Sequence, residues 1–279
     1  MDFLLVGGDD RQLYLAQMLI DAGHTVRCYA LENAPLPDGA RHTDKPDAEC
    51  VILPLPVEGK PGLLNAPYSA KQHPIAELLS AIAPGSLVCG GKLSPLLRDE
   101  ARSRSLRIYD YMTMPQFVVG NAAVTAEGAV SLLADNNLST IFDTKILIVG
   151  FGRIGRLLAH KLCGLDAETY VMSKNSESRA LAGCMGLHAV SPADSSVFSA
   201  FDAVINTAPA QVIPTLEGFR KNCLLLELAS APGGFDRSEV EKRGLKCIHA
   251  AGLPGRYAPK SAARLVFDAV QQILREEAK

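Results

Sequence analysis

The sequence lacks the features that mark several classes of protein. Its 28 Lys and Arg are balanced by 30 Asp and Glu and form no basic block, so nucleic acid is not an expected partner. The six histidines are isolated, with no His-X-X-X-His pair, so no metal is expected. Seven scattered cysteines without a Cys-X-X-Cys pair favour reduced thiols, packed as small apolar side chains in a cytoplasmic protein.

Signals for secretion and for membrane insertion are also missing. The first residues, MDFLLVGGDD, have no cationic flank and no long apolar region, so they are not expected to form a signal peptide. No segment approaches the roughly 20 apolar residues that span a bilayer, so a membrane is not an expected partner. The sequence also has no Gly-X-Ser-X-Gly elbow of a hydrolase.

What the chain does contain is a repeated alternation of short apolar runs with helical patterns. This alternation predicts parallel sheets with crossover helices, and 279 residues favour two domains. The expected strands are residues 3–6, 25–29, 50–55, 86–89, 106–109, 145–149, 168–172, 203–206, 224–228 and 246–249. The predicted fold class is α/β, with two tandem Rossmann-like, doubly wound parallel-sheet domains joined by a long helix.

The domain boundaries follow from the helices at the ends of these two series of strands. Residues 121–136 have apolar side chains at helical spacing and form the expected linking helix. Residues 261–277 form an amphipathic helix that is expected to pack back on the first domain. We therefore expect a substrate-binding, catalytic domain at residues 1–119 with 258–279, and a dinucleotide-binding domain at residues 120–257.

A glycine-rich motif follows the buried-strand pattern of residues 145–149 and opens a helix. It consists of Gly150-Phe151-Gly152-Arg153-Ile154-Gly155. Gly150 permits the tight turn, Gly152 lets the backbone approach a diphosphate, and Gly155 lets the helix pack closely on the strand. Between a strand and a helix this motif predicts a dinucleotide site; the alternative is a glycine turn kept only for packing.

The tip of the next strand favours NADP, although NAD stays open. An NAD site usually places a carboxylate there, about twenty residues after the glycines, to bind the ribose 2′-hydroxyl. Here Ser173 and Lys174 stand at the tip, and the first carboxylate is Glu177. Ser173, Lys174 and Arg179 could instead bind a 2′-phosphate; alternatively, Lys174 and Arg179 are solvated surface charges.

Two later loops follow strands at the edge where such cofactors bind. Thr207-Ala208-Pro209 is expected to pass near the nicotinamide half, and Ala229-Ser230 follows the next strand. Either loop could be an ordinary turn instead.

The first domain contains an incomplete version of the glycine motif, Gly7-Gly8-Asp9-Asp10-Arg11, which lacks the third glycine. Arg11 could bind a substrate carboxylate with two parallel hydrogen bonds. Alternatively, Asp9 and Asp10 cap a helix and Arg11 lies in solvent.

Two further segments contain candidate catalytic residues. Glu127 is placed early in the linking helix, where it could act as a base, orient one, or serve as a first-turn helix charge. Lys260 and Ser261 follow a Gly- and Pro-rich segment before the last helix, and with Arg256 they could bind a carboxylate. The alternative for this segment is a structured turn with an N-cap.

Several of these motifs together resemble the A subunit family of dipicolinate synthase, and they occur in matching order over essentially the whole chain. They are Gly7-Gly8-Asp9-Asp10-Arg11-Gln12-Leu13, Thr125-Ala126-Glu127-Gly128, Gly150-Phe151-Gly152-Arg153-Ile154-Gly155, Leu228-Ala229-Ser230-Ala231-Pro232-Gly233-Gly234, Gly252-Leu253-Pro254-Gly255 and Ala258-Pro259-Lys260. More distantly, the layout resembles D-2-hydroxyacid and alanine dehydrogenases. The His–carboxylate pair of the hydroxyacid enzymes has no match here, so their mechanism is not transferred.

The resemblance implies an NADP-dependent dehydrogenase that makes pyridine-2,6-dicarboxylate during sporulation, in the cytoplasm of the mother cell. The implied substrate is dihydrodipicolinate or its hydroxytetrahydro precursor, at the branch point of lysine synthesis. The implied partners are this small dicarboxylate and a flavoprotein-like second subunit; we also expect a homo-oligomer.

We therefore hypothesise that Arg11 and the helix start at Lys260-Ser261 hold the substrate carboxylates. NADP⁺ takes a hydride, and Glu127 or water takes a proton. The alternatives are an amino-acid or shikimate-type dehydrogenase on another small acid, or a non-catalytic NADP-binding scaffold subunit.

Overall fold

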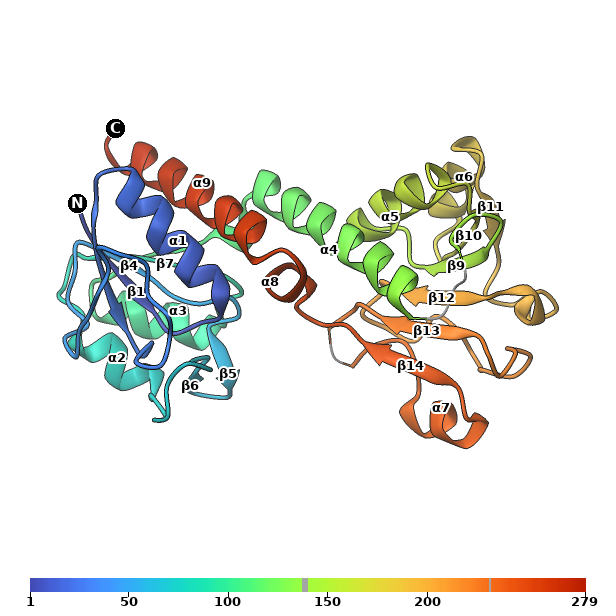
Figure 1. Ribbon diagram of the computed structural model, residues 1–279, viewed down its shortest axis with the longest axis horizontal. Coiled ribbons are helices and arrows are strands. Elements are labelled where there is room, and N and C mark those ends of the chain that lie inside the picture. The colour runs from blue at the N-terminus through green and yellow to red at the C-terminus, as the bar shows by residue number, and fades with distance from the viewer. Residues whose placement is uncertain (137–139, 231) are drawn as a thin grey trace. The chain divides into compact units, whose positions relative to one another are not determined.

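Two six-stranded parallel sheets organise the chain (Figure 1), and their strand orders are β3-β2-β1-β4-β7-β8 and β11-β10-β9-β12-β13-β14. Counted along the chain within each sheet, both orders are 3-2-1-4-5-6, the doubly wound order of dinucleotide-binding domains. The prediction of two Rossmann-like α/β domains is therefore confirmed. The structure, a computed structural model, describes residues 1–136, 140–230 and 232–279.

The first unit comprises Met1–Asn121 and Ala258–Lys279. Its sheet strands are β1 (Asp2–Val6), β2 (Thr25–Tyr29), β3 (Arg41–His42), β4 (Cys50–Ile52), β7 (Leu87–Gly90) and β8 (Arg107–Asp110). Its helices include α1 (Asp10–Asp21), α2 (Ile75–Ala81), α3 (Pro95–Ser103) and α9 (Pro259–Glu277). A short hairpin of β5 (Glu58–Lys60) and β6 (Leu63–Leu64) lies between β4 and α2 in the chain.

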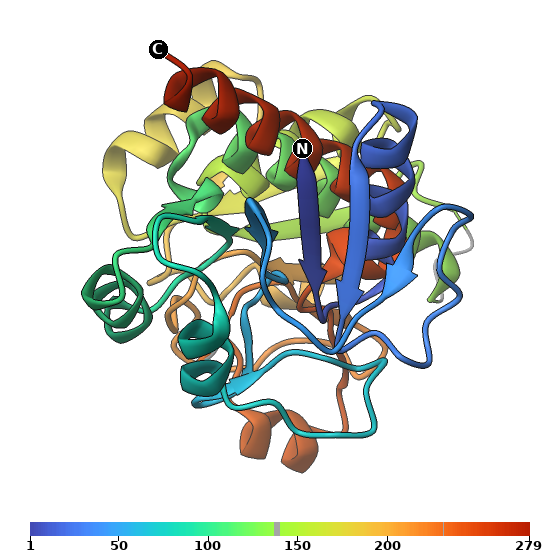
Figure 2. The same ribbon diagram turned by 90° about the vertical axis from the view of Figure 1, so that its left-hand side faces the viewer.

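The sheet of the first unit is buried on both faces, as an all-parallel sheet requires. Phe3 and Leu5 of β1 pack on the same side as α1 and α9, whereas Leu4 and Val6 pack with residues of α2 and α3. Figure 2 turns this unit toward the viewer and shows the blue strands β1 and β2 next to each other. The last helix thus packs on the first unit, beside α1, although the two are far apart in sequence (Figure 1).

The second unit comprises Ala122–Tyr257. Its strands are β9 (Lys145–Val149), β10 (Glu168–Met172), β11 (His188–Val190), β12 (Ala203–Asn206), β13 (Leu224–Glu227) and β14 (Lys246–His249). Its helices include α5 (Arg153–Cys163), α6 (Ser176–Cys184), α7 (Arg237–Arg243) and α8 (Leu253–Tyr257). Alternate residues of β9 point into two separate apolar layers, one with α5 and one with the 198–201 segment and α7.

Helix α4 (Pro115–Asp135) begins in the first unit and continues into the second, and it starts earlier than the expected residue 121. It is 21 residues long with a hydropathy of 1.5, so by length and composition it could cross a membrane. The expectation that no segment approaches this length is therefore wrong. However, Ala126, Ala129 and Leu133 are fully buried in the core of the second unit. A core helix of a soluble protein can have the same length and apolar composition as a membrane-spanning helix.

Candidate functional site

The glycine loop between β9 and α5 is closely packed at its first and third glycines. Gly150 has a φ of +92°, and a Cβ there would lie 2.8 Å from the Thr207 hydroxyl. A Cβ on Gly155 would lie 2.3 Å from the Gly150 carbonyl oxygen. Thr207 donates a 2.9 Å hydrogen bond to the carbonyl of Val149, so the loop after β12 is tied to the glycine loop.

The second glycine of the loop leaves the N-terminus of α5 open. Gly152 is the N-cap residue of α5 and provides no side-chain cap. A Cβ on Gly152 would meet nothing within 4 Å. The first amides of α5 and the positive end of its dipole are therefore available to an anion, as a diphosphate site requires. Phe151 is buried and Arg153 is exposed beside this opening.

The tip of β10 presents cationic and hydroxyl groups. Arg179 of α6 donates from Nη1 to the carbonyl oxygens of Ser173, at 2.7 Å, and Lys174, at 3.0 Å. Lys174 donates from Nζ to the carbonyl oxygen of Gln211 at 2.9 Å. Glu177 is exposed in the first turn of α6, beyond this tip. Both cations thus donate to backbone carbonyls, and Lys174 is exposed.

A buried polar pair at the ends of β12 and β13 was not anticipated from the sequence. Asn206 is fully buried and Glu227 is 4% exposed, and the amide of Asn206 donates to the carboxylate at 2.6 Å. Of the predicted loop residues, Thr207, Ala208 and Ala229 are half-buried, whereas Pro209 and Ser230 are exposed. Ala231, in the same motif, lies outside the described residues. The sequence does contain an indication of this pair, because Asn206 and Glu227 are the polar residues that end two apolar runs.

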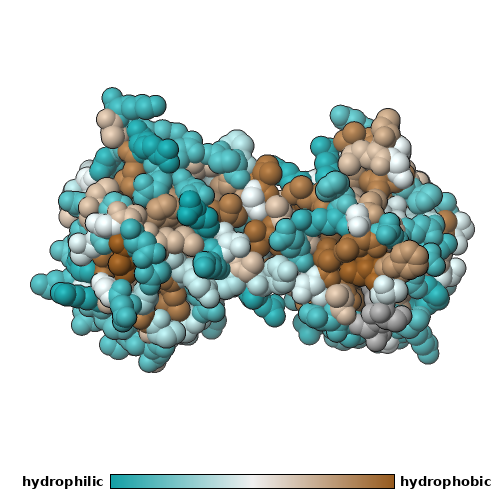
Figure 3. Space-filling model, turned by 45° about the horizontal axis from the view of Figure 1, so that its top comes forward, coloured by the Kyte–Doolittle hydropathy of each residue, from teal (hydrophilic) through white to brown (hydrophobic). Residues whose placement is uncertain are grey.

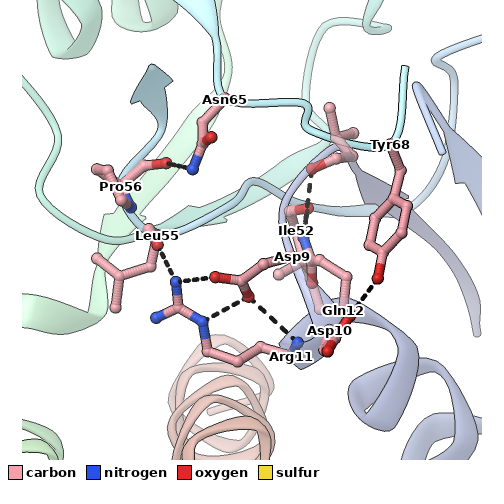
Figure 4. A network of polar contacts seen from close by, with 10 residues as sticks. Asp9, Asp10, Arg11, Gln12, Ile52, Leu55, Pro56, Asn65 and Tyr68 are labelled. Atoms are coloured by element: carbon pink, nitrogen blue, oxygen red, sulfur yellow. Dashed lines mark hydrogen bonds and ion pairs between the residues drawn. The ribbon is translucent and has the colours of Figure 1, made fainter. Parts of the chain in front are cut away.

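The equivalent loop of the first unit, between β1 and α1, is closed to phosphate. Asp9 is the N-cap residue of α1, where α5 has Gly152. The amide of Gly8 already donates to the carbonyl oxygen of Asn65 at 2.7 Å. Gln12 stands in place of the third glycine, and its buried side chain donates to the carbonyl oxygen of Val6 at 3.2 Å. A carboxylate and the chain's own atoms thus take the place that a phosphate would need (Figure 4).

Arg11 lies in this closed loop and is paired within the chain. Its Nε and Nη2 each lie 2.8 Å from a carboxylate oxygen of Asp9, and Nη2 also donates to the carbonyl oxygen of Leu55 (Figure 4). The Arg11 side chain is 12% exposed, so the alternative that places it in solvent is wrong. The two-bond edge of the guanidinium is occupied by Asp9. A ligand carboxylate would have to use Nη1 or displace Asp9.

Glu127 lies in the middle of α4, not in its first turn, because the helix begins at Pro115. The alternative role as a first-turn charge is therefore wrong. The Glu127 carboxylate is 53% exposed and pairs with the Lys161 ammonium group at 2.9 Å. Next to it, Gly128 lets α4 approach α8 closely, since a Cβ there would lie 3.3 Å from Leu253 and Tyr257. The role of Glu127 as a base stays a prediction.

Lys260 and Ser261 are exposed in the first turn of α9. The helix begins at Pro259, and its N-cap residue Ala258 makes no side-chain cap bond. The Gly- and Pro-rich segment before it contains the short helix α8 (Leu253–Tyr257), which follows Gly252 at a φ of +73°. Both polar side chains are thus accessible at a helix N-terminus.

The titratable groups elsewhere are mostly structural. The seven cysteines are free, and burial raises the pKa of the Cys28 and Cys223 thiols to about 12. Within the described residues, no group of three or more His, Cys, Asp or Glu side chains is arranged to bind a metal.

The fold and the open glycine loop define a protein of two Rossmann-like domains, with the features of a dinucleotide site in the second. A transhydrogenase from Sinorhizobium meliloti has the same fold, with a TM-score of 0.69 at 17% identity, over 99% of this chain and 94% of that chain.

Two comparisons over the full length are more specific. The A subunit of dipicolinate synthase from Bacillus subtilis (strain 168) is 25% identical over 98% of this chain and 95% of its own length. The crystal structure of the corresponding A subunit from Bacillus halodurans matches with a TM-score of 0.85 at 25% identity, over 98% of this chain and 97% of that chain.

Residues 2–112 match the family model of the N-terminal domain of the dipicolinate synthase A subunit. Over nearly its full length the chain is therefore similar to dipicolinate synthase A subunits, and its first domain matches their family model.

Proposed function

We propose that this protein is the A subunit of a dipicolinate synthase. It oxidises dihydrodipicolinate, or its hydroxytetrahydro precursor with loss of one water, to pyridine-2,6-dicarboxylate with NADP⁺ as the hydride acceptor. One observation supports this most: the α5 N-terminus is open behind three glycines, whereas the matching loop of the first unit is filled by Asp9. Each chain therefore offers one dinucleotide site, in its second unit, and the first unit is left for the substrate.

NADP is the cofactor that the tip of β10 favours. The 2′-phosphate would lie near the Ser173 hydroxyl and the cations of Lys174 and Arg179. In the described part of the chain, the bonds of Arg179 to backbone carbonyls use Nη1, so Nε and Nη2 face no carbonyl partner. A guanidinium edge of this kind binds phosphate with two parallel hydrogen bonds. A bound NADP⁺ would accept the hydride that leaves the substrate ring.

The substrate is a dicarboxylate, and the first unit provides cations for it. Arg11 lines a small hollow with Gly8, Pro54 and Tyr111, and Lys260 with Ser261 offers a cation and a hydroxyl at the start of α9. When hydride leaves a ring carbon of dihydrodipicolinate and a proton goes to Glu127 or water, an aromatic ring results. Aromatisation makes this step favourable, so the protein contributes mainly orientation and exclusion of water.

The relatives' description as one subunit of a synthase supports a partner chain. We propose that this partner is a flavoprotein-like second subunit, and that the chain also forms a homo-oligomer in the cytoplasm of the mother cell of a sporulating bacterium. Apolar patches on the surface support such contacts (Figure 3). In the second unit, Phe142 is 62% exposed and Leu165 is 43% exposed on neighbouring turns joined by the bond from Asp143 N to Asp166 O.

A non-catalytic scaffold subunit is the second candidate, and two observations favour it. Arg11 is already paired with Asp9, and Glu127 is already paired with Lys161. An NADP-binding subunit that only supports its partner would tolerate both pairs. A dehydrogenase acting on another small acid, such as an amino acid or a shikimate-type substrate, would need the same loop but different carboxylate contacts.

The direct test follows NADP⁺ reduction at 340 nm with freshly generated lysine-pathway intermediate, with and without the second subunit. The dehydrogenase predicts NADPH formation that requires this chain. Tight NADP binding with no reduction in either mixture would favour the scaffold. Reduction with alanine or a shikimate-type acid, but not with the intermediate, would favour the third candidate.

A further inference from the structure

The ends of β12 and β13 are linked by a buried pair of polar side chains, Asn206 and Glu227. The two residues are direct partners in the parallel register of these strands. Asn206 is 0% exposed and Glu227 is 4% exposed. A carboxylate removed from water to this extent requires compensation by hydrogen bonds.

The compensation comes from the backbone that follows β13. One carboxylate oxygen of Glu227 accepts from Asn206 Nδ2 at 2.6 Å and from the amide of Ala229 at 3.1 Å. The other accepts from the amides of Gly234 at 2.7 Å and Phe235 at 3.2 Å. The carboxylate therefore holds both the beginning and the end of the segment after β13.

Two glycines make this arrangement possible. Gly233 has a φ of +81°, and a Cβ there would lie 3.0 Å from the Glu227 carboxylate. A Cβ on Gly234 would lie 2.5 Å from Asn206 Nδ2. The Gly-Gly pair thus lets the returning backbone approach the buried side chains.

Asn206 extends the same network to the segment after β12. Its Oδ1 accepts from the amide of Ala208 at 3.2 Å, and its Nδ2 donates to the carbonyl oxygen of Ala208 at 2.9 Å. Ala208 in turn touches the glycine loop, because a Cβ on Gly150 would lie 3.2 Å from the Ala208 amide nitrogen. One buried pair therefore fixes the loops after β12 and β13 at the carboxyl edge of the sheet, the first of which lies against the glycine loop.

In a sheet of order 3-2-1-4-5-6, the fourth and fifth strands belong to the second half of the dinucleotide site. Here these strands are β12 and β13. We infer that Glu227, with Asn206, is a positioning residue that shapes the loops at Ala208 and Ala229 to receive the nicotinamide half of the cofactor. This inference rests on the proposed function, since it presupposes a dinucleotide on the Gly150 loop.

The test compares two ligands by calorimetry: NADPH, and adenosine 2′,5′-bisphosphate, which lacks the nicotinamide half. Glu227→Gln replaces one carboxylate oxygen by an NH2 group, which cannot accept hydrogen bonds. Two of the four hydrogen bonds that the side chain accepts are therefore lost. We expect the Kd for NADPH to rise about tenfold or more, since hydrogen bonds to a charged group are among the stronger ones. The Kd for the bisphosphate should stay unchanged.

The matched control is Asp202→Asn, at the opposite end of the same sheet. Asp202 accepts from the amide of Lys145 at 2.9 Å, so this variant also weakens a carboxylate–backbone bond in the second unit. We expect it to bind both ligands like the wild type. Asn206→Ala is the second variant; it keeps the backbone bonds of Glu227 and should weaken NADPH binding in the same direction.

Three other results would overturn the inference. If Glu227→Gln or Asn206→Ala binds NADPH like the wild type, the pair does not position the cofactor. If both ligands weaken equally, the pair only supports the fold, which a lowered unfolding temperature would also report. If the wild type binds neither ligand, the proposed function itself fails, and this inference fails with it.

Discussion

At the scale of single residues, the three glycines of the loop differ in what a side chain added at each position would contact. Gly155 leaves no room for a Cβ, Gly150 needs a left-handed backbone, and Gly152 faces open space. These three environments correspond to the three roles that the motif predicts: close packing, a tight turn and approach of a ligand. A substitution at Gly155 is therefore expected to destabilise the fold, whereas one at Gly152 is expected to leave folding unchanged.

Gly155→Ala should destabilise the second unit. A Cβ 2.3 Å from the Gly150 carbonyl oxygen must displace backbone, which we expect to lower the free energy of unfolding by about 1–3 kcal/mol and to weaken NADPH binding. Gly183→Ala is the control, because its Cβ in α6 would meet nothing within 4 Å. That helix should gain up to about 1 kcal/mol. Thermal unfolding and calorimetry measure both, and equal effects of the two variants would contradict the packing argument.

Arg179→Ala should change cofactor preference. Loss of a guanidinium beside Ser173 is expected to weaken NADPH binding about tenfold while leaving NADH binding nearly unchanged. Titration of both cofactors measures the ratio. Arg237→Ala, whose 84% exposed side chain pairs with Glu241 of the same helix, serves as the control for loss of one positive charge. A parallel loss of NADPH and NADH affinity would show that Arg179 only braces the loop.

At the scale of elements, the long apolar runs became the strands that their patterns predict. Residues 25–29, 145–149 and 168–172 match β2, β9 and β10 without a shift. In the described part of the chain, the missed strands are the edge strands β3 and β11 of the two sheets and the hairpin strands β5 and β6, all of which have only two or three residues. Periodicity could not find them, because only pairing with a neighbouring strand defines them. The start of α4 was also missed. The helix begins with Pro115 at its first position, before the apolar spacing of residues 121–136 from which the helix was predicted.

The packing of α9 on the first unit includes a titratable contact at its end. Tyr109 of β8 and Arg107 bind the Glu277 carboxylate, and chiefly the Tyr109 hydrogen bond lowers the pKa of Glu277 below its ordinary value of 4.5. A lowered pKa in the folded state means that the stabilisation is complete above pH 4.5. It is lost as the pH falls through the folded-state pKa.

Glu277→Gln should therefore lower the unfolding temperature at pH 7, and the difference from the wild type should shrink below about pH 4.5. Thermal unfolding over a pH series measures this difference. The neighbouring exposed Glu276, whose side chain accepts from Gln272 of the same helix, provides the control as Glu276→Gln. A difference that stays constant down to pH 3 would contradict the assigned contact.

At the scale of the whole molecule, two domains with the same strand order have diverged at the same loop. The second retains an open helix N-terminus, and the first places Asp9 and the Asn65 carbonyl oxygen there. Their shared topology alone would allow two dinucleotides per chain. The residues at the equivalent N-cap positions favour one dinucleotide instead. In the first unit, the Asp9 carboxylate repels a phosphate and accepts the hydrogen bond of a helix amide that a phosphate would need.

We accordingly expect calorimetry to find one NADPH per chain. Gly152→Asp copies the acid of the first unit into the second, and its open surroundings let the protein fold normally. This variant should lose NADPH binding by about a hundredfold or more, because the new carboxylate repels the diphosphate and competes for the same amides. Gly152→Ala, which adds only a methyl group, should bind more tightly than Gly152→Asp. Two bound NADPH in the wild type, or full binding by Gly152→Asp, would contradict the comparison of the loops.

The sequence by itself determined the longer strands, the two doubly wound domains and the glycine loop, because these depend on local periodicity and on short motifs. Only the tertiary structure decided which polar groups meet. Arg11 is joined to Leu55 across 44 residues and Asn206 to Glu227 across 21, and no local pattern encodes such pairs. Burial then selects among the alternatives, since a charge removed from water must find a partner wherever the fold brings one. That requirement brought Arg11 to the Leu55 carbonyl oxygen and placed Glu227 beneath the loops of the proposed cofactor site.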